Sequence, residues 1–286
     1  LLKEIFGTRR GTRDAGRQTR DESQILAVGK PKRDEFVYQP DFRQEKDHSL
    51  VVISEGCDNF CSYCVVPYVR GRLRHRNPED IIKEIEVNIN KGIGHVTLLG
   101  QNVCAYGAEY RNQSTETRNN NIDFIRLLKL VNSIKDLKEF SFVTSHPKDA
   151  SAGHFQAMAR LEKLKKYLHL PFQSGSNRIL ELMKRGYTYA QYLHLTEQYR
   201  THVPQGELTT DIIIGFPSET EEDFQQTLDL VKKVRFNSAY IFKYSPRPHA
   251  EAGKLKDDVP KQEKERRHQV LLETQKQISK ELKAAK

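Results

Sequence analysis

The sequence predicts an α/β fold, a partial, TIM-like (β/α)6 barrel preceded by a basic N-terminal extension. Between residues 50 and 244, six short runs rich in β-branched and aromatic residues alternate with segments of helical periodicity. Several of these runs are apolar at consecutive positions, as expected of parallel strands covered on both faces. Repeated strand–helix units indicate a parallel sheet with right-handed crossovers. A doubly wound open sheet is the alternative arrangement.

The predicted elements follow one another at regular spacing. The first helix has a clear start, because Asn77 can cap it and Pro78 suits its first position, and Gly92 ends it. The predicted strands are 50–54, 95–99, 139–144, 167–172, 208–214 and 239–244. The remaining predicted helices are 122–134, 150–161, 177–184, 189–202, 221–234 and 260–282.

Residues 1–48 differ from this regular part. Within residues 8–20 lie five arginines, opposed only by Asp14, and there is no apolar periodicity. We interpret 1–48 as a basic linker or a remnant of a preceding domain, in preference to a specific nucleic-acid arm. The second domain is then 49–286.

Length and composition narrow the possible classes of protein. The 286 residues suffice for one large domain or two small ones, and 47 Lys and Arg against 38 Asp and Glu give a net charge of +9. This charge favours a polyanionic partner. No apolar run approaches the roughly 18 residues of a transmembrane helix, so we expect no membrane association. The start of the chain is too short and too charged for a signal peptide, and it lacks Met, so we expect a piece of a longer gene product.

Each predicted strand leads into a polar, often glycine-rich turn. In a parallel (β/α) array these turns meet at the C-terminal rim, where such folds place their chemistry. The turns are Gly56-Cys57, Gly100-Gln101-Asn102, Ser145-His146-Pro147, Gln173-Ser174-Gly175-Ser176, Gly215-Phe216-Pro217 and Ser245-Pro246-Arg247. A single site at this rim is therefore predicted.

Three cysteines provide the strongest chemical motif. Cys57, Cys61 and Cys64 have the spacing C-x3-C-x2-C in the first of these turns, and three thiolates on one short loop can bind a soft metal centre. A zinc site requires four ligands, and neither His75 nor Cys104 has zinc-finger spacing. Three ligands without a clear fourth favour an iron–sulfur cluster with one open iron over zinc or buried, metal-free cysteines. This use of cysteine fits a reducing compartment, and we expect a cytoplasmic protein.

The cysteine motif and several longer words resemble the radical S-adenosylmethionine (SAM) enzymes, and among them the methylthiotransferases. The resemblance covers about residues 49–275. The words are Tyr63-Cys64-Val65-Val66-Pro67-Tyr68-Val69-Arg70-Gly71, Leu98-Leu99-Gly100-Gln101-Asn102-Val103, Thr144-Ser145-His146-Pro147, His169-Leu170-Pro171-Phe172-Gln173-Ser174-Gly175-Ser176, Met183-Lys184-Arg185-Gly186-Tyr187, Thr210-Asp211-Ile212-Ile213-Ile214-Gly215-Phe216-Pro217 and Phe242-Lys243-Tyr244-Ser245-Pro246-Arg247-Pro248. The Gly-Gln-Asn-Val word is similar to the MiaB-type branch, which methylthiolates isopentenyl-adenosine beside the tRNA anticodon.

The resemblance implies a fold of the radical SAM type and roles for particular residues. Cys57, Cys61 and Cys64 would hold a 4Fe–4S cluster whose open iron binds the amino and carboxylate groups of SAM, and one electron from a reducing donor would then release a 5′-deoxyadenosyl radical. Tyr63 would lie near the cofactor adenine, unless it is only a half-buried loop aromatic. Gly100, Gln101 and Asn102 would meet the amino group, although Gln101 also fits a plain helix entry. We propose Ser145, Gln173 and Asp211 as contacts to the ribose, the carboxylate or the substrate.

A run of alternating arginines suggests contacts to RNA. Arg70, Arg72, Arg74 and Arg76 follow the third cysteine closely, which favours phosphate contacts to a tRNA anticodon loop over a solvated charge run. Arg247 is a candidate contact to cofactor or substrate. The target adenine has to be unstacked to reach a buried radical.

Two family features are absent from this sequence. No cysteine precedes Cys57, whereas the family normally carries an N-terminal domain with three more, and the chain ends in helical sequence rather than in a small β-rich RNA-binding domain. We therefore expect a central fragment of a methylthiotransferase that binds one cluster and SAM, with complete sulfur insertion in doubt. The rivals are a sister methylthiotransferase acting on threonylcarbamoyladenosine or a ribosomal protein, and a zinc-stabilised, non-catalytic RNA-binding module.

Overall fold

The computed structural model describes residues 43–45, 47–108 and 122–285. The chain divides after Val37, and every described residue belongs to the unit 38–286. The arginine-rich stretch predicted within residues 1–42 lies outside the described residues. Residues 43–45, predicted as part of the extension, form strand β1 (Arg43–Glu45), which pairs antiparallel with β2 (His48–Val52). The sheet therefore begins before the predicted boundary at residue 49.

The six predicted parallel strands are present and lie in chain order. Two parallel ladders, β2-β5-β6 and β7-β8-β9, are connected by a bridge between Phe140 and Leu164. A doubly wound sheet reverses its strand order at a switch point, and no reversal occurs here. The order confirms a partial barrel, which stays open because no ladder joins β9 to β2 in the described part of the chain. The remaining strands of the barrel are β5 (His95–Leu99), β6 (Glu139–Val143), β7 (Tyr167–His169), β8 (Glu207–Ile214) and β9 (Ser238–Lys243).

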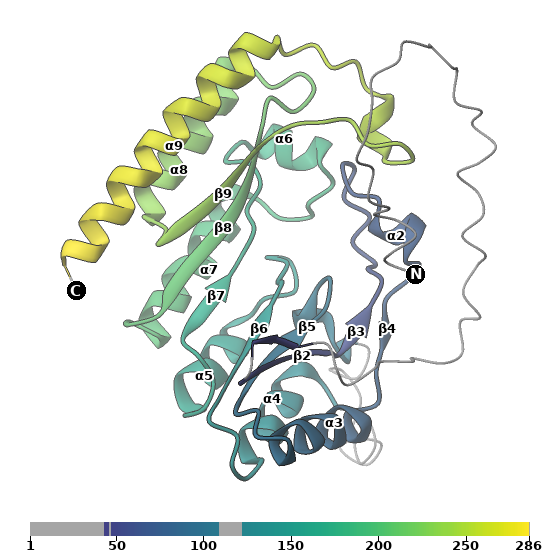
Figure 1. Ribbon diagram of the computed structural model, residues 1–286. Coiled ribbons are helices and arrows are strands. Elements are labelled where there is room, and N and C mark those ends of the chain that lie inside the picture. The colour runs from purple at the N-terminus through teal and green to yellow at the C-terminus, as the bar shows by residue number, and fades with distance from the viewer. Residues whose placement is uncertain (1–42, 46, 109–121, 286) are drawn as a thin grey trace, which may run out of the picture. The chain divides into compact units, whose positions relative to one another are not determined.

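The long helices cover the outer face of the strands (Figure 1). They are α3 (Pro78–Asn90), α4 (Phe124–Ser133), α5 (Ala152–Arg160), α7 (Tyr189–His202), α8 (Glu221–Val234) and α9 (Lys261–Ala284). Shorter elements lie in the connections: β3 (Ser54–Glu55), α2 (Val66–Val69), β4 (Arg74–His75), the 3-10 turn η2 (Val103–Ala105), α6 (Asn177–Leu182) and the 3-10 turn η5 (Glu251–Lys254). Among the described residues, no helix combines the length and apolar character needed to cross a membrane.

Local sequence signals explain where several helices begin and end. The side chain of Asn77 accepts a hydrogen bond from the backbone N–H of Glu79 and so caps α3, as predicted. Gly92 follows that helix with φ of +86°, a conformation that glycine adopts without strain. Helices α7 and α8 have the predicted bounds, and each starts with a capping box, Thr188 with Gln191 and Thr220 with Asp223.

Strand β7 is shorter than predicted, because the regular ladder ends at His169 instead of reaching Phe172. The next N–H that faces β8, that of Phe172, donates to the Thr210 hydroxyl (3.0 Å) instead of a backbone carbonyl, which interrupts the ladder. The chain resumes contact at Gln173, whose N–H bonds the Asp211 carbonyl and whose φ is +69°. This irregular segment turns the Gln173 side chain toward the rim.

The core fills the space between the strands and the helices. Its fully buried side chains come from both layers, and burying one such side chain stabilises the fold by about 1.5–3 kcal/mol. Examples are Leu98, Phe142, Leu168, Ile212, Ile85, Phe155, Tyr192 and Val231. The core leaves the C-terminal rim free for polar groups.

Candidate cofactor site

The three cysteines lie on one loop between β3 and α2 at the C-terminal rim. The base of the loop is closed by β3–β4 pairing and by a hydrogen bond from Cys57 N–H to the Gly71 carbonyl (3.2 Å). Gly56 has φ of +71°, and a Cβ there would overlap the backbone of Gly71 and Arg72. The close approach of the two arms therefore requires glycine at position 56.

Contacts from three other strand-end segments fix the position of this loop. Ser62 N–H bonds the Met183 carbonyl (3.0 Å) after α6, and the Ala252 N–H bonds the Ser62 carbonyl (2.7 Å). The Asp149 carboxylate, beyond β6, accepts hydrogen bonds from Asn59 Nδ2 (3.1 Å) and from Asn102 Nδ2 (2.5 Å). The rim segments after β6, β7 and β9 thus contact the cysteine loop, and Asn102 after β5 joins them through Asp149.

The thiols occupy a largely enclosed position. Cys61 is buried, and Cys57 and Cys64 are half-buried. Burial raises the pKa of the Cys57 and Cys64 thiols, and the charge of neighbouring thiols raises both pKa values further. These two thiols therefore hold their protons at neutral pH, and a bound metal centre would displace those protons.

The spacing of the donors bears on the kind of metal centre. Among the described residues, no three His, Cys, Asp or Glu side chains lie close enough to hold one metal ion together. A structural zinc ion needs four ligands around a single point. In an iron–sulfur cluster each cysteine binds a different iron, which places the sulfurs farther apart. Three thiols on one loop can therefore supply three of the four iron ligands of such a cluster.

Buried carboxamide oxygens at the same rim have no hydrogen-bond partner. They belong to Gln101 and Asn102 after β5 and to Gln173 after β7. An unpaired buried oxygen is costly, and because each of these atoms is an acceptor, the partner it lacks is a donor. The amino and hydroxyl groups of SAM, in which an amino acid is joined to a nucleoside through a sulfonium sulfur, are such donors, so these residues fit the cofactor that the sequence predicts.

A cavity of about 300 Å³ opens beside the cysteine loop. Its lining includes four of the predicted residues, Tyr63, Gln173, Asp211 and Arg247. We call it the inner pocket. Asp211 is oriented by His169, whose Nε2 lies 3.3 Å from Asp211 Oδ2. Phe242 on β9 also lines the pocket and leaves 54% of its surface exposed. The inner pocket thus offers an aromatic surface together with polar groups of both charges.

Four predicted cofactor residues lie outside the lining of the inner pocket: Gln101 and Asn102, whose oxygens are described above, and Ser145 and Gly100. Ser145 is buried, and its hydroxyl contacts the Cys104 thiol at 3.5 Å, which accounts for both side chains within the fold. Gly100 lies against Ser54, where a Cβ would overlap the Ser54 hydroxyl. Gly100 therefore provides space between two rim segments.

The structure separates the predicted run of four arginines into two pairs. Arg70 and Arg72 are exposed, and Arg72 contacts Asp58 at 3.4 Å. Arg74 forms an ion pair with Glu55 (3.0 Å), and Arg76 pairs with the half-buried Glu84 and donates to the Val52 carbonyl (3.1 Å). Arg76 is therefore part of the scaffold, and the prediction of RNA contacts now rests mainly on Arg70 and Arg72.

The prediction of site residues missed Arg185, Asp149 and His146. Arg185 lies beyond α6, and its Nη1 is 3.3 Å from the Cys61 sulfur. His146 Nδ1 accepts the Lys148 N–H (3.2 Å), which leaves Nε2 to carry the proton that faces Cys61 Sγ at 3.7 Å. Burial, with the positive charge of Arg185, lowers the pKa of His146 to about 2, so the ring is neutral.

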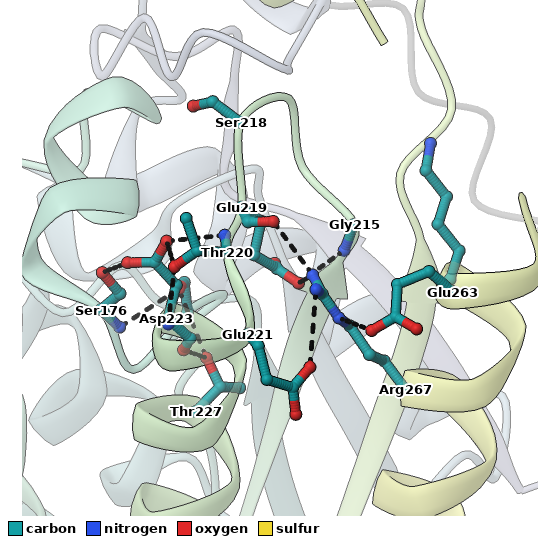
Figure 2. A network of polar contacts seen from close by, with 12 residues as sticks. Ser176, Gly215, Ser218, Glu219, Thr220, Glu221, Asp223, Thr227, Glu263 and Arg267 are labelled. Atoms are coloured by element: carbon teal, nitrogen blue, oxygen red, sulfur yellow. Dashed lines mark hydrogen bonds and ion pairs between the residues drawn. The ribbon is translucent and has the colours of Figure 1, made fainter. Parts of the chain in front are cut away.

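A second polar cluster contacts the turns that follow β7 and β8 (Figure 2). The Asp223 carboxylate accepts the Ser176 hydroxyl (2.6 Å), and Thr227 Oγ1 accepts the Gly175 N–H (2.9 Å). Glu219 accepts the Gly215 N–H (3.0 Å) and forms a buried ion pair with Arg267 of α9 (2.7 Å). We call this cluster the Figure 2 network, and it fixes the turns after β7 and β8.

Known sequences that match this chain belong to one superfamily, and the relatives described below share one name. The family model described as the radical SAM superfamily matches residues 51–231. The tRNA-2-methylthio-N(6)-dimethylallyladenosine synthase of Moorella thermoacetica is 48% identical over 240 residues, covering 84% of this chain and 52% of that protein. The protein of the same name from Thermotoga petrophila is 43% identical over 263 residues, covering 91% and 58%. The chain spans about half the length of the curated relatives it matches.

Solved structures share the fold at low sequence identity. TsrM, a radical S-adenosylmethionine methyltransferase from Kitasatospora setae, gives a TM-score of 0.58 at 15% identity, covering 73% of this chain and 38% of that chain. The coproporphyrinogen III oxidase HemN from Escherichia coli gives 0.56 at 18% identity, covering 84% and 54%. These likenesses confirm the predicted α/β barrel.

Proposed function

Because the chain belongs to the radical SAM superfamily, we propose that it binds a 4Fe–4S cluster and SAM and serves in attaching a methylthio group to C2 of N6-isopentenyladenosine beside the tRNA anticodon. The observation that carries the proposal is the meeting of Cys57, Cys61 and Cys64 with unpaired carboxamide oxygens at one rim. The names of the relatives, at 43–48% identity, support the choice of tRNA substrate.

The proposed division of labour among the residues follows their chemistry. The three thiolates would hold the cluster, and the bound cluster and SAM would supply a carbon-centred radical. Gln101, Asn102 and Gln173 would accept hydrogen bonds from the amino and hydroxyl groups of the cofactor, and Asp211 would do the same from its position in the inner pocket. Tyr63, Phe242 and Arg247 line the space in which an adenine base would stack.

The surface beside the cysteine loop supports RNA binding in this proposal. Arg70 and Arg72 leave the loop with exposed side chains, and the whole chain has a net charge of +9. Guanidinium groups at such positions would hold the phosphates of the anticodon loop while the target base is unstacked toward the rim.

The proposed reaction needs a source of electrons and a reducing environment. Cleavage of SAM consumes an electron, so we propose a reducing electron donor as a partner. Four cysteines without a disulfide among the described residues fit a reducing compartment, and we propose the cytoplasm.

The test measures two products separately. The chain is reconstituted anaerobically with iron and sulfide and incubated with SAM, dithionite and tRNA that carries N6-isopentenyladenosine. We expect 5′-deoxyadenosine from the chain itself, and none from Cys57→Ala. The methylthio nucleoside is sought by mass spectrometry with the complete gene product, because the matched relatives are about twice as long as the matched segment.

A matched tRNA that carries threonylcarbamoyladenosine serves as the control substrate. We expect no methylthio product from it. Product from that tRNA alone would assign the chain to the sister enzymes. A chain that holds its cluster yet forms no 5′-deoxyadenosine would contradict the proposal.

A further inference from the structure

The short helix α2 exposes two large apolar side chains beside the cysteine loop. Tyr68 is 51% exposed and Val69 is 66% exposed. The same helix buries Pro67, and the Val65 carbonyl accepts the N–H groups of Tyr68 (3.0 Å) and Val69 (3.1 Å). The two exposed side chains are therefore carried on a segment that is anchored to the fold.

Tyr68 is part of a surface on which aromatic rings and guanidinium groups meet. Its ring centre lies 5.9 Å from that of Phe60 on the cysteine loop, with the two ring planes at 85°. The Arg72 guanidinium lies over the Phe60 ring, 4.7 Å from its centre. Because a perpendicular contact with one ring cannot cover both faces of the other, Phe60 leaves at least one face of Tyr68 uncovered. We call Phe60, Tyr68, Val69, Arg70 and Arg72 the aromatic platform.

The make-up of the aromatic platform favours an unpaired RNA base as its occupant over a protein partner. A stable protein interface takes roughly 20–30 residues on each side and has an apolar centre. The platform offers two exposed apolar side chains and two exposed arginines, Arg70 and Arg72. Surfaces that bind single-stranded nucleic acid combine cationic groups for the phosphates with aromatic rings for the bases. The net charge of +9 adds to the attraction for a polyanion.

Resting on the proposed function, we propose that the ring of Tyr68 stacks against an unpaired RNA base that neighbours the target base, while Arg70 and Arg72 hold the adjoining phosphates. The target base has to leave the stack to reach the cofactor, so its neighbours lose a stacking partner. The exposed face of Tyr68 would replace that partner. Tyr68 follows Cys64 by four positions, which places the stacked base close to the cysteine loop.

The first experiment measures the affinity of the chain for a fluorescein-labelled RNA stem–loop, shaped like an anticodon arm, by anisotropy at a fixed salt concentration. Tyr68→Leu removes the ring but keeps an apolar side chain, and Tyr68→Phe keeps the ring. Stacking of one base on an aromatic side chain is worth about 5- to 150-fold in affinity. We therefore expect weaker binding by about that factor in Tyr68→Leu, and an affinity close to that of wild type in Tyr68→Phe.

Two controls accompany this measurement. Leu272→Ala changes a 40% exposed apolar side chain on α9, away from the platform, and should leave the affinity for the stem–loop unchanged. A fully paired RNA of the same length offers phosphates but no unpaired base. Tyr68→Leu should therefore bind the paired RNA as well as wild type does.

The absence of tryptophan from the sequence allows a second, independent measurement. Tyr68→Trp introduces the only indole of the chain at the platform, and a base that stacks on it quenches its fluorescence. We expect the stem–loop to quench this emission and the fully paired RNA to leave it unchanged. Leu272→Trp is the matched control, and its emission should not respond to either RNA.

Several results would overturn the proposal. They are an affinity for the stem–loop that Tyr68→Leu leaves unchanged, a loss in Tyr68→Phe as large as that in Tyr68→Leu, and a Tyr68→Trp emission that the bound stem–loop does not quench. An equal loss for both RNAs in Tyr68→Leu would indicate a changed fold, and the quenching of Tyr68→Trp then decides. Formation of 5′-deoxyadenosine by the wild-type chain is measured in parallel, because its absence contradicts the proposed function and not the role of Tyr68.

Discussion

Two buried arginines of this protein, Arg267 and Arg185, have opposite surroundings. Each is 4% exposed, and each donates a hydrogen bond to the backbone of a segment at the carboxyl ends of the strands. Arg267 donates to Glu219 (2.7 Å) and to Glu263 (2.7 Å), so its charge is balanced within the chain. Arg185 contacts hydroxyl, carbonyl and thiol groups and has no carboxylate within reach among the described residues.

Buried polar groups that are paired within the chain mark the scaffold, and those that are unpaired mark the candidate site. In the Figure 2 network the donors and acceptors satisfy one another, which fixes the turns after β7 and β8. Around the cysteine loop a cation is unbalanced and carboxamide oxygens of Gln101, Asn102 and Gln173 are unpaired. Polar groups that the chain leaves unsatisfied at one rim indicate groups that a ligand completes.

The largest expected effect on stability comes from a change in the Figure 2 network. Arg267→Met leaves the buried Glu219 carboxylate without its cation, and breaking a buried ion pair in this way costs about 3–5 kcal/mol. Urea unfolding of the metal-free chain, followed by circular dichroism, measures the loss. A loss below about 1 kcal/mol would show that the Figure 2 network is not the scaffold described above.

A smaller effect is expected from Asp223→Asn in the same network. The carboxylate accepts hydrogen bonds from Ser176 (2.6 Å) and from the backbone and hydroxyl of Thr220 (2.8 Å each), and losing charged acceptors costs about 1–3 kcal/mol. The same urea titration gives the value. Gln225→Ala, at an exposed position of α8, is the control and should leave the unfolding midpoint nearly unchanged.

The difference in unfolding free energy between wild type and Asp223→Asn should depend on pH in one direction. Burial alone would raise the pKa of Asp223, but hydrogen bonds from Arg178, Ser176 and Thr220 outweigh it and lower the pKa from 3.8 to about 2. A lowered pKa means that the carboxylate stabilises the fold fully above about pH 4 and progressively less as the pH falls toward 2. The gap between wild type and Asp223→Asn, measured from pH 6 downward, should therefore shrink below pH 4. A gap that widens on acidification would contradict this assignment.

The smallest expected effect comes from Arg185→Met in the metal-free chain. Replacing an unbalanced buried charge by an apolar side chain of similar length is often neutral or stabilising, so we expect a change within about 1 kcal/mol. The Pro171 carbonyl keeps a partner in Tyr187, whose hydroxyl lies 3.4 Å away. A loss as large as that of Arg267→Met would remove the distinction between the two arginines.

The barrel could be predicted from the sequence because its signals are local. Apolar runs placed the six strands, and Asn77 with Pro78 and Gly92 placed the first helix. The exception was β7, where the apolar run continues past His169 but the Phe172 N–H bonds the Thr210 hydroxyl instead of a β8 carbonyl. A run of apolar residues predicts burial, but a ladder also requires the N–H groups that face the neighbouring strand to reach its carbonyls.

The site was predictable only where residues carry a motif. The cysteine spacing identified the loop, and Tyr63, Gln173, Asp211 and Arg247 do line one pocket. Arg185 escaped notice because its partner Cys61 is 124 positions away, and Asp149 because it joins Asn59 and Asn102 across 90 and 47 positions. Arg76 resembled its neighbours in the run, but Glu84 pairs with it inside the fold.

The EPR spectrum of the reduced, reconstituted chain, recorded before and after adding SAM, tests most directly whether three thiols bind a cluster with one iron left for the cofactor. We predict the signal of a reduced 4Fe–4S cluster whose g-values change when SAM is added, since the cofactor would bind an iron that the protein does not. A chain without such a signal, or a cluster signal that SAM leaves unchanged, would contradict the account.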